Sequence, residues 1–351
     1  TYYYRQLRSE KGKNGLDYLK KRELSDSTIN SFGLGYATQS TGNLYKLLKD
    51  KGYDDDILKE SGLFTYERGI HEKFWNRVIF PIMDINNKVI GFGGRVMGDA
   101  KPKYLNSPET RLFDKSRNLY GLNIARTSRK PNMIICEGYM DVISMHQAGF
   151  NQAVASLGTA LTQGHARLLK RYTDNVLITY DSDEAGVKAA LRAIPILKEA
   201  GLSTKVINMR PYKDPDEFIK AMGAEAFQER IDNAENSFMY EIRTMLRNYD
   251  RGDPESETAF EREVAAKLVT FKEKLERDNY LKAVCRQFMI PEDGMRQMVS
   301  RLGNQEGIIS RNAGAGTPQP TVERKPKKKR EDGLRQAEKM LLTWLISDRD
   351  I

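Results

Sequence analysis

Cysteine and histidine are scarce in this sequence. It has two cysteines, Cys136 and Cys285, far apart within apolar stretches, and three scattered histidines, His71, His146 and His165. Two isolated cysteines offer neither a disulfide framework nor a CxxC zinc site. Because zinc catalysis uses clustered His and Cys ligands, we expect no zinc in this chain.

Long hydrophobic runs are also lacking. No apolar run approaches the roughly 20 residues that span a bilayer, and the N-terminal TYYYRQLRSE has no apolar core of an export signal. The sequence therefore predicts a cytoplasmic protein without a membrane partner. A chain of 351 residues, 39% hydrophobic and 30% charged, should form two or three globular domains. Its net charge of +9 favours a polyanionic partner, although such an excess is common.

The first third of the chain combines helices with a short antiparallel sheet. Before residue 60, segments such as DYLKKREL carry apolar positions three and four residues apart, as amphipathic helices do. Further on, RVIFPIMDINNKVIGFGGRVM holds two apolar runs joined by Asn86 and Asn87, residues that suit a hairpin turn. We predict an N-terminal α+β subdomain over residues 1–118.

A parallel sheet is predicted in the middle of the chain. Short apolar runs alternate there with amphipathic stretches, a pattern typical of strands buried on both faces and joined by helical crossovers. The runs are NMIIC (132–136), AVAS (153–156), NVLITY (175–180) and STKVINM (203–209). We assign residues 119–232 to this subdomain.

The remainder of the chain is predicted to be helical, apart from a linker. Residues 233–303 have no strand-like run, and Asp253 with Pro254 suits a helix start. Residues 304–333 are rich in Gly, Pro and charge, as flexible linkers are. Residues 334–351 resume a helical period without local packing partners, so we expect them to begin a further domain that continues beyond this sequence.

Acidic residues follow three of the predicted strands. In an open parallel sheet, side chains that act on a ligand gather where strands end at their carboxyl edge. The acids at these ends are Glu137 and Asp141, then Asp181, Asp183 and Glu184, and finally Asp214, Asp216 and Glu217. A single acid in such a place is more often a helix cap.

Convergence of these acids favours a metal site over separate caps. Crowded like charges raise one another's pKa values and usually persist only where a cation neutralises them. Carboxylate oxygens without His or Cys favour Mg²⁺ or Mn²⁺ over zinc.

A basic segment precedes the sheet. Residues 85–130 contain ten Lys or Arg residues against three Asp or Glu, an excess of seven that accounts for most of the +9. Within it, FGGRVMGDAKPKYLNSPET interleaves Arg95, Lys103, Tyr104 and Asn106 with Gly and Pro, a composition suited to holding phosphates and stacking bases. A solvated basic face is the alternative interpretation.

Together these motifs resemble a known family. EGYMD after one strand and DSDEAG after another are similar to the Toprim domain of bacterial primases, topoisomerases and some nucleases. With GFGGR, PKYLNSPET, FDKSRNLYG and KDPDEF, the chain resembles the RNA polymerase core of DnaG-type bacterial replicative primases from residue 1 to about residue 300. The resemblance implies an α/β fold with a Toprim-type parallel sheet flanked by helices, a basic α+β N-terminal subdomain and a C-terminal helical bundle.

The resemblance also implies residue roles. The catalytic acids would be Glu137, Asp141, Asp181 and Asp183. The metal ligands would be Glu137, Asp181, Asp183, Asp214 and Asp216. Nucleotide phosphates, template and primer would be held by Arg95, Lys103, Tyr104, Asn106 and Lys115.

The implied activity is synthesis of short RNA primers from NTPs on a single-stranded DNA template. Two Mg²⁺ or Mn²⁺ ions about 4 Å apart would be bridged by Glu137 and the DxD carboxylates. A replicative helicase is the expected partner, through the domain that residues 334–351 begin, and the core is expected to be a monomer. Family members also begin with a zinc-binding domain that this sequence lacks, so we expect an excised core.

Two alternatives stay open beside primer synthesis. A Toprim nuclease would use the same acids to hydrolyse nucleic acid, and a noncatalytic single-strand-binding scaffold would hold one structural ion with them. The extended basic segment favours synthesis over cleavage, and the complete set of acids argues against a scaffold. Strand passage is disfavoured because Ala185 stands where topoisomerases carry the Glu of DxDxE.

Overall fold

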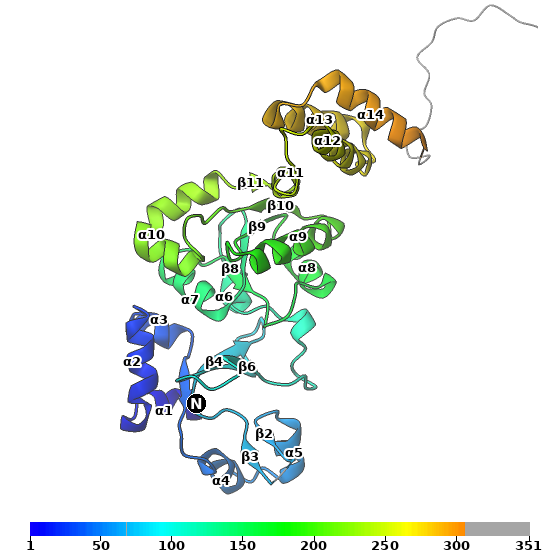
Figure 1. Cartoon of the computed structure of the whole chain (residues 1–351). Helices are drawn as coiled ribbons and strands as arrows, with labels where there is room; N and C mark the ends of the chain where they lie inside the picture. Colours follow the sequence, from blue (N-terminus) through cyan, green and yellow to red (C-terminus); the bar gives the residue numbers. More distant parts are fainter. Residues whose placement is uncertain (68, 306–351) are drawn as a thin grey trace, which may run out of the picture.

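The computed structural model describes residues 1–67 and 69–305. They form an N-terminal region (1–126), a parallel-sheet region (133–236) and a helical region (237–305) that follow one another along the molecule (Figure 1). Apart from residues 304 and 305, which are helical, the predicted linker and the predicted start of a further domain lie outside the described residues. No helix in the described ranges is long and apolar enough to cross a bilayer.

The N-terminal region is built on a four-stranded antiparallel sheet. Its strands, in spatial order, are β1 (Gly35–Ala37), β4 (Arg77–Met83), β5 (Val89–Val96) and β6 (Tyr104–Asn106). A separate ladder joins β2 (Phe64–Thr65) to β3 (His71–Glu72). The helical elements are α1 (Tyr2–Leu7), η1 (Glu10–Gly12), α2 (Lys13–Lys21), α3 (Asp26–Ser31), α4 (Asn43–Asp50), α5 (Asp55–Glu60), η2 (Lys115–Arg117) and α6 (Leu122–Ala125).

The hairpin predicted from the sequence is confirmed as β4 and β5. Asn87 adopts a positive φ of 61° in the turn, a conformation that Asn tolerates better than most residues. The side chain of Asp84 accepts the backbone N–H groups of Asn86 and Lys88 at 2.8 and 2.9 Å. The hairpin pairs Arg95 of β5 with Val78 of β4, and on the other edge of β5 the strand β6 places Tyr104 opposite Arg95.

All four apolar runs predicted as parallel strands are strands of one sheet. Its spatial order is β11 (Glu235–Asn236), β10 (Ser203–Val206), β9 (Asn175–Ile178), β7 (Met133–Cys136) and β8 (Ala153–Ala155). The strand missing from the prediction is β11, a two-residue antiparallel edge strand without a hydrophobic pattern. The crossover helices are α7 (Tyr139–Gln147), α8 (Gln163–Lys170), α9 (Glu184–Glu199) and α10 (Pro215–Asp232).

Helices cover both faces of this sheet, as the continuous burial of its strands requires. One hydrophobic cluster joins Ile134 and Cys136 of β7 to side chains of α7 and α10. Another joins Met133 and Ile135 of the same strand to α8 and α9. In Figure 1 the two helix pairs accordingly lie on opposite sides of the sheet.

The N-terminal and parallel-sheet regions share a core. The first cluster extends from Tyr139 of α7 to Phe80 of β4. The rings of these two residues stack with their centroids 5.0 Å apart. Tyr139 also lies against Gly93, where an added Cβ would come within 2.5 Å of the ring. The glycines of GFGGR therefore allow a helix of one region to dock on the sheet of the other.

The helical region has its own core, as predicted. Its helices are α11 (Ser237–Leu246), α12 (Pro254–Val269), α13 (Lys274–Phe288) and α14 (Glu292–Gln305). Asp253 caps α12 by accepting the N–H of Ser256 at 2.8 Å, and Pro254 is its first residue, as the sequence indicated. Phe260, Leu268 and Val284 are among the buried side chains of the bundle.

Candidate functional site

Two neighbouring strand ends bring acidic residues together at the carboxyl edge of the parallel sheet. β7 and β9 pair in parallel, with Ile135 opposite Ile178, so the residues that follow them leave the sheet side by side. The backbone N–H of Asp181 donates to Oε1 of Glu137 at 3.0 Å. The structure therefore unites two acids that lie 44 positions apart in the sequence.

The segment that follows β10 adds a third acid. Ser182 ties the two loops together, because its backbone N–H donates to the carbonyl oxygen of Lys213 at 2.8 Å and its hydroxyl donates to that of Tyr212 at 2.9 Å. Asp214, the next residue, is thus held near Asp181. We call the acids of these loops and of the first turn of α7 the acidic edge: Glu137, Asp141, Asp181, Asp183 and Asp214.

The acidic edge is electrostatically unfavourable as it stands. Burial, and then the charge of Asp181, raises the pKa of Glu137. Burial, and then the charge of Asp214, raises the pKa of both Asp181 and Asp141. Lys213 lies 3.6 Å from Asp181 and offsets part of this repulsion. Glu137, Asp141 and Asp181 therefore hold their protons more tightly than isolated carboxyls would.

Several of these acids also have the local role that the cap interpretation anticipated. Asp183 caps α9 by accepting the N–H of Gly186 at 2.9 Å, and Asp141 accepts the N–H of Gly138 at 3.0 Å. Asp214 caps α10 in the same way. A cap needs only one acceptor, so a carboxylate that caps a helix keeps further lone pairs for another ligand.

Donor chemistry at the acidic edge fits a hard divalent cation. Within residues 1–67 and 69–305, no three Asp, Glu, His or Cys side chains are arranged closely enough to enclose an ion, so side-chain rotation would be needed to complete a ligand set. Glu137 and Asp183 lie at the surface and each accepts one backbone N–H group, so such a rotation would exchange that hydrogen bond for a metal contact. Carboxylate oxygens that repel one another, with one lysine against them, are the donors that Mg²⁺ and Mn²⁺ prefer.

Asp216 does not join these acids, contrary to the expectation that it is a ligand. It is buried, at 4% exposure, and turns toward the N-terminal region. Its Oδ2 lies 3.0 Å from Nη1 of Arg22 and 2.9 Å from Nζ of Lys220. Two cations thus already neutralise the carboxylate whose motif predicted a metal ligand.

A basic strand surface lies beside the acidic edge. Arg95 and Tyr104 are paired across β5 and β6, and the guanidinium of Arg95 lies 4.3 Å from the ring centroid of Tyr18. Burial raises the pKa of Tyr104 to about 12, with contributions from Tyr18 and Asp141. The ring centroid of Tyr104 lies 6.2 Å from that of Tyr139, which stands between Glu137 and Asp141 in the sequence, so the two surfaces are neighbours. Lys103 precedes Tyr104 and is exposed.

Asn106 has a structural role that the sequence did not predict. Its Oδ1 accepts the hydroxyl of Tyr139 at 2.8 Å, and its Nδ2 donates to the carbonyl oxygen of Leu157 at 2.7 Å. It therefore joins β6 to α7 and to the loop after β8. Both ends of the amide thus hold the two regions together, and the second N–H of Nδ2 stays available to another partner.

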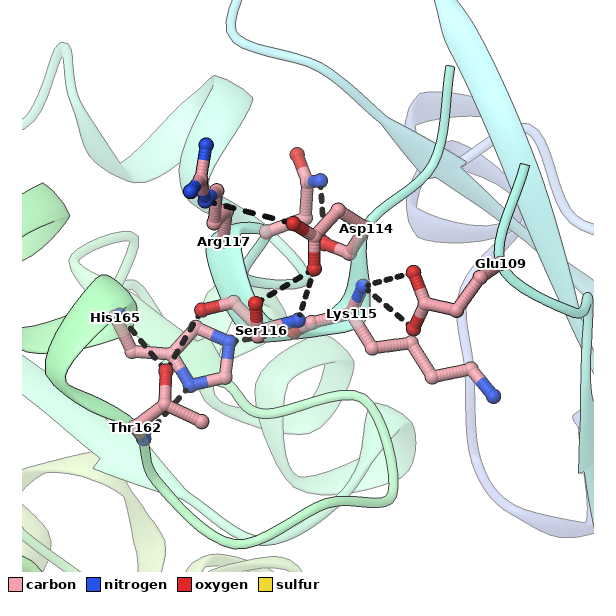
Figure 2. Close-up of polar contacts among 8 residues, drawn as sticks. Glu109, Asp114, Lys115, Ser116, Arg117, Thr162 and His165 are labelled. Atoms are coloured by element: carbon pink, nitrogen blue, oxygen red, sulfur yellow. Dashed lines mark hydrogen bonds and ion pairs between the residues drawn. The ribbon is translucent and has the colours of Figure 1, made fainter. Parts of the chain in front are cut away.

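Lys115 lies on the turn η2, and hydrogen bonds to its backbone N–H and carbonyl groups hold this turn in place (Figure 2). Its N–H donates to the carboxylate of Glu109 at 3.1 and 3.2 Å, and its carbonyl oxygen accepts Nε2–H of buried His165 at 2.7 Å. Nδ1 of this histidine accepts the N–H of Thr162 at 3.2 Å, and burial lowers its pKa, so the ring is neutral. The ammonium group of Lys115 points away from these contacts in Figure 2. We call Arg95, Lys103, Tyr104 and Lys115 the basic wall.

Sequence reasoning missed the residues that support the basic wall. Tyr18 and Arg22 belong to a predicted amphipathic helix, whose pattern indicates packing and no role in a site. His165 lies in another part of the chain. The contacts of these three residues with Lys115, Arg95 and Asp216 span 50 to 194 positions and leave no local pattern. The sequence could have indicated Tyr139, because this residue stands inside EGYMD, the motif that also supplies Glu137 and Asp141.

Comparison with known proteins supports the same division of the chain. Residues 2–126 match the family model "DNA primase catalytic core, N-terminal domain", and residues 134–219 match "Toprim-like". The chain is 41% identical over 321 residues to a DNA primase of Clostridium acetobutylicum, covering 90% of this chain and 53% of that protein. It spans about half the length of the curated relatives it matches.

Solved structures agree with the sequence matches. A DNA primase domain from Pseudomonas aeruginosa superposes with a TM-score of 0.72 at 33% identity, covering 85% of this chain and 96% of that one. A DnaG primase catalytic domain bound to ssDNA superposes with a TM-score of 0.68 at 33% identity, covering 88% of this chain and 93% of that one. The predicted fold class is confirmed, and the chain belongs to the family of DnaG-type DNA primases, of which it contains the catalytic core.

Proposed function

We propose that this chain synthesises short RNA primers from ribonucleoside triphosphates on a single-stranded DNA template. The observation that carries the proposal is the approach of the basic wall to the acidic edge, in a member of the DnaG family: the ring centroid of Tyr104 lies 6.2 Å from that of Tyr139, which stands between Glu137 and Asp141 in the sequence. A triphosphate bound between them would meet cations on one side and metal-holding carboxylates on the other. The similar catalytic domain described as bound to ssDNA supports a single-stranded template as the second substrate.

A divalent cation, Mg²⁺ or Mn²⁺, would be held by Glu137, Asp181, Asp183 and Asp214. When bound, it would lower the pKa of the primer 3′-hydroxyl and offset negative charge on the triphosphate and the departing pyrophosphate. The carboxylates would orient the primer end and the triphosphate toward each other. Asp141 would support Glu137 from the first turn of α7, where it caps the Glu137–Gly138 turn.

The basic wall would bind the nucleic acid and the nucleotide. Arg95, Lys103 and Lys115 would hold phosphates, and the exposed ring of Tyr104 would stack against a base. Nucleotidyl transfer needs little covalent work from the protein, so this positioning and the neutralisation of charge would supply most of the acceleration. No Ser-His or Cys-His pair is required.

The wider context belongs to the same proposal. We assign the protein to the cytoplasm and the replisome, with the RNA primer as product and a replicative helicase as partner. The catalytic core would act as a monomer.

Incubation with single-stranded DNA, NTPs and Mg²⁺ or Mn²⁺ tests the proposal. The expected product is RNA complementary to the template, lost in Glu137→Gln and in Asp183→Asn. Degraded template without RNA would support the nuclease alternative instead. Nucleic-acid binding without any metal-dependent product would support the scaffold alternative, and equal synthesis by both variants would contradict the assigned acids.

A further inference from the structure

The surroundings of Asp216 are those of a structural ion pair. Asp216 lies in the first turn of α10, and besides Arg22 and Lys220 it accepts a hydrogen bond from the hydroxyl of Ser144 on α7. It therefore joins three helices: α2, α7 and α10. A buried carboxylate with this set of partners has no need of a metal, because its charge is already compensated and its oxygens already accept hydrogen bonds.

Arg22 carries the connection from Asp216 toward the basic wall. It is the C-cap residue of α2, and Tyr18 lies one turn earlier on the same helix. The guanidinium of Arg22 lies 6.0 Å from the ring centroid of Tyr18, and that of Arg95 lies 4.3 Å from the same ring. Tyr18 is thus in contact with both cations, an arrangement in which the ring faces attract the guanidinium groups.

Arg95 depends on this arrangement for its orientation. Its side chain donates one hydrogen bond to a protein group, from Nη1 to the carbonyl oxygen of Val96 at 3.2 Å. Its Nε is buried without a hydrogen-bond partner among the described residues. No acidic side chain there forms an ion pair with it either, so the ring of Tyr18 is its main support.

We propose that Asp216 is a positioning residue and not a metal ligand: through Arg22 and Tyr18 it orients Arg95 toward the phosphates of the bound nucleotide. The proposal rests on the proposed function in one respect, the assignment of nucleotide phosphates to Arg95. It separates the two aspartates of KDPDEF, because Asp214 faces the acidic edge and Asp216 faces α2. It also gives the N-terminal helix α2 a part in nucleotide binding.

The proposal predicts that metal binding and nucleotide binding respond differently to Asp216. Asp216→Asn keeps the shape and the hydrogen-bond acceptor but removes the charge that holds Arg22. Affinity for a nonhydrolysable ribonucleoside triphosphate should fall about tenfold, a typical coupling between contacting residues. Affinity for Mn²⁺ alone should stay within about twofold of the wild type, whereas Asp214→Asn should lower it about tenfold.

A double-mutant cycle with Arg95 isolates the pathway. Because Asp216 acts through Arg95, Asp216→Asn should weaken nucleotide binding in the wild-type background and have little further effect in Arg95→Gln. Lys220→Gln is the matched control, since it removes the other cation on Asp216 without touching Tyr18, and it should leave nucleotide affinity nearly unchanged. In primer synthesis, Asp216→Asn should raise KM for NTP more than it lowers kcat.

Mn²⁺ binding would be measured by electron paramagnetic resonance and nucleotide binding by calorimetry, on variants with native circular dichroism. Loss of Mn²⁺ affinity in Asp216→Asn equal to that of Asp214→Asn would overturn the proposal, as would additive effects of Asp216→Asn and Arg95→Gln. Should Asp216→Asn fail to fold, Arg22→Gln decides: weaker nucleotide binding with unchanged Mn²⁺ affinity supports the proposal, and unchanged nucleotide binding contradicts it. Failure of the wild type to make RNA would count against the proposed function alone, since these binding measurements require no synthesis.

Discussion

The acidic edge and the basic wall are neighbouring surfaces that the chain builds in different ways. The acids come from consecutive strand ends of one parallel sheet, and hydrogen bonds between adjacent loops hold Glu137, Asp181 and Asp214 together. The cations come from β5, from the segment before β6 and from a 3₁₀ turn, and residues from other parts of the chain support Arg95 and Lys115. The sheet alone positions the first surface, whereas long-range contacts position the second.

The two surfaces also differ in the kind of partner that each depends on. At the acidic edge, burial and then like charges raise the pKa values of Glu137, Asp141 and Asp181, so the edge gains from a cation. At the basic wall, positioning depends on neutral partners such as Tyr18 and His165. Removal of an acid should therefore damage chemistry while relieving repulsion, and removal of a supporting partner should damage positioning and stability together.

Glu137→Gln should have the largest effect on activity. Loss of a carboxylate that holds the metal and the primer end should lower the rate of primer synthesis at least about a hundredfold, as removal of one charge-stabilising group does in other active sites. Steady-state RNA synthesis measures this change. Glu184→Gln is the control, because Glu184 is exposed and pairs only with Lys188, and it should retain activity.

Asn106→Ala tests the joint between the two surfaces. It leaves the hydroxyl of Tyr139 and the carbonyl of Leu157 without their partner, which should cost about 2 kcal/mol of unfolding free energy. Urea denaturation measures the loss. Asn123→Ala, which removes a contact with Asn87 on the surface, should cost less than about 0.5 kcal/mol. Equal losses in both variants would show that Asn106 does not join the regions.

His165→Ala tests the support of Lys115. Two hydrogen bonds are lost, so we expect about 1–2 kcal/mol of destabilisation and weaker binding of single-stranded DNA. Burial lowers the pKa of His165, so the folded state binds fewer protons than the unfolded state. Its stabilising contribution is full above the unfolded pKa of about 6.5 and is lost as the pH falls toward the folded value.

Urea midpoints measured between pH 8 and pH 5, a range chosen around the histidine pKa of about 6.5, check this sign. The wild type should lose stability on acidification more steeply than His165→Gln. His146→Gln serves as the comparison, because His146 is also buried with a lowered pKa but contacts the carbonyl of Ala153 and not Lys115. Only the His165 variant should weaken DNA binding.

Asp181→Asn should give the smallest change in the free energy of unfolding, and it should stabilise the metal-free protein where Asn106→Ala and His165→Ala destabilise it. Because the pKa of Asp181 is raised, the folded metal-free protein binds more protons than the unfolded state, and its stability falls as the pH rises through the folded pKa. At neutral pH the metal-free variant should be more stable than the wild type by about 0.5 kcal/mol, the size of a like-charge interaction near the surface. Thermal melting should show Mg²⁺ stabilising the wild type much more than the variant.

The sequence predicted most of the fold because its elements carry strong local patterns. The strands β7, β8 and β9 lie within short apolar runs, β10 alternates buried and exposed residues, and the β4–β5 hairpin has a recognisable Asn turn. β11 was missed because two polar residues at a sheet edge carry no pattern. The convergence of Glu137 and Asp181 followed from strand order, a rule that needs no side-chain detail.

The remainder of the site could not be predicted because it depends on partners distant in sequence. KDPDEF presents Asp214 and Asp216 as equivalent, and only the position of Arg22, 194 residues away, separates them. Asn106 stands beside Lys103 and Tyr104 in a basic motif, but Leu157 and Tyr139 determine its role. Identity of a polar residue is a local property, whereas its role depends on which partners the fold brings to it.

The central claim is that the acidic edge and the basic wall form one site that a metal-bound triphosphate fills. Titration of Mn²⁺ by electron paramagnetic resonance, with and without a nonhydrolysable ribonucleoside triphosphate, tests it most directly. After correction for Mn²⁺ bound by the free nucleotide, the protein should bind Mn²⁺ at least about fivefold more tightly with nucleotide present, and by linkage the nucleotide more tightly with Mn²⁺ present. Arg95→Gln should reduce this coupling without changing the affinity for Mn²⁺ alone. Independent binding of the two ligands to the wild type would contradict the claim.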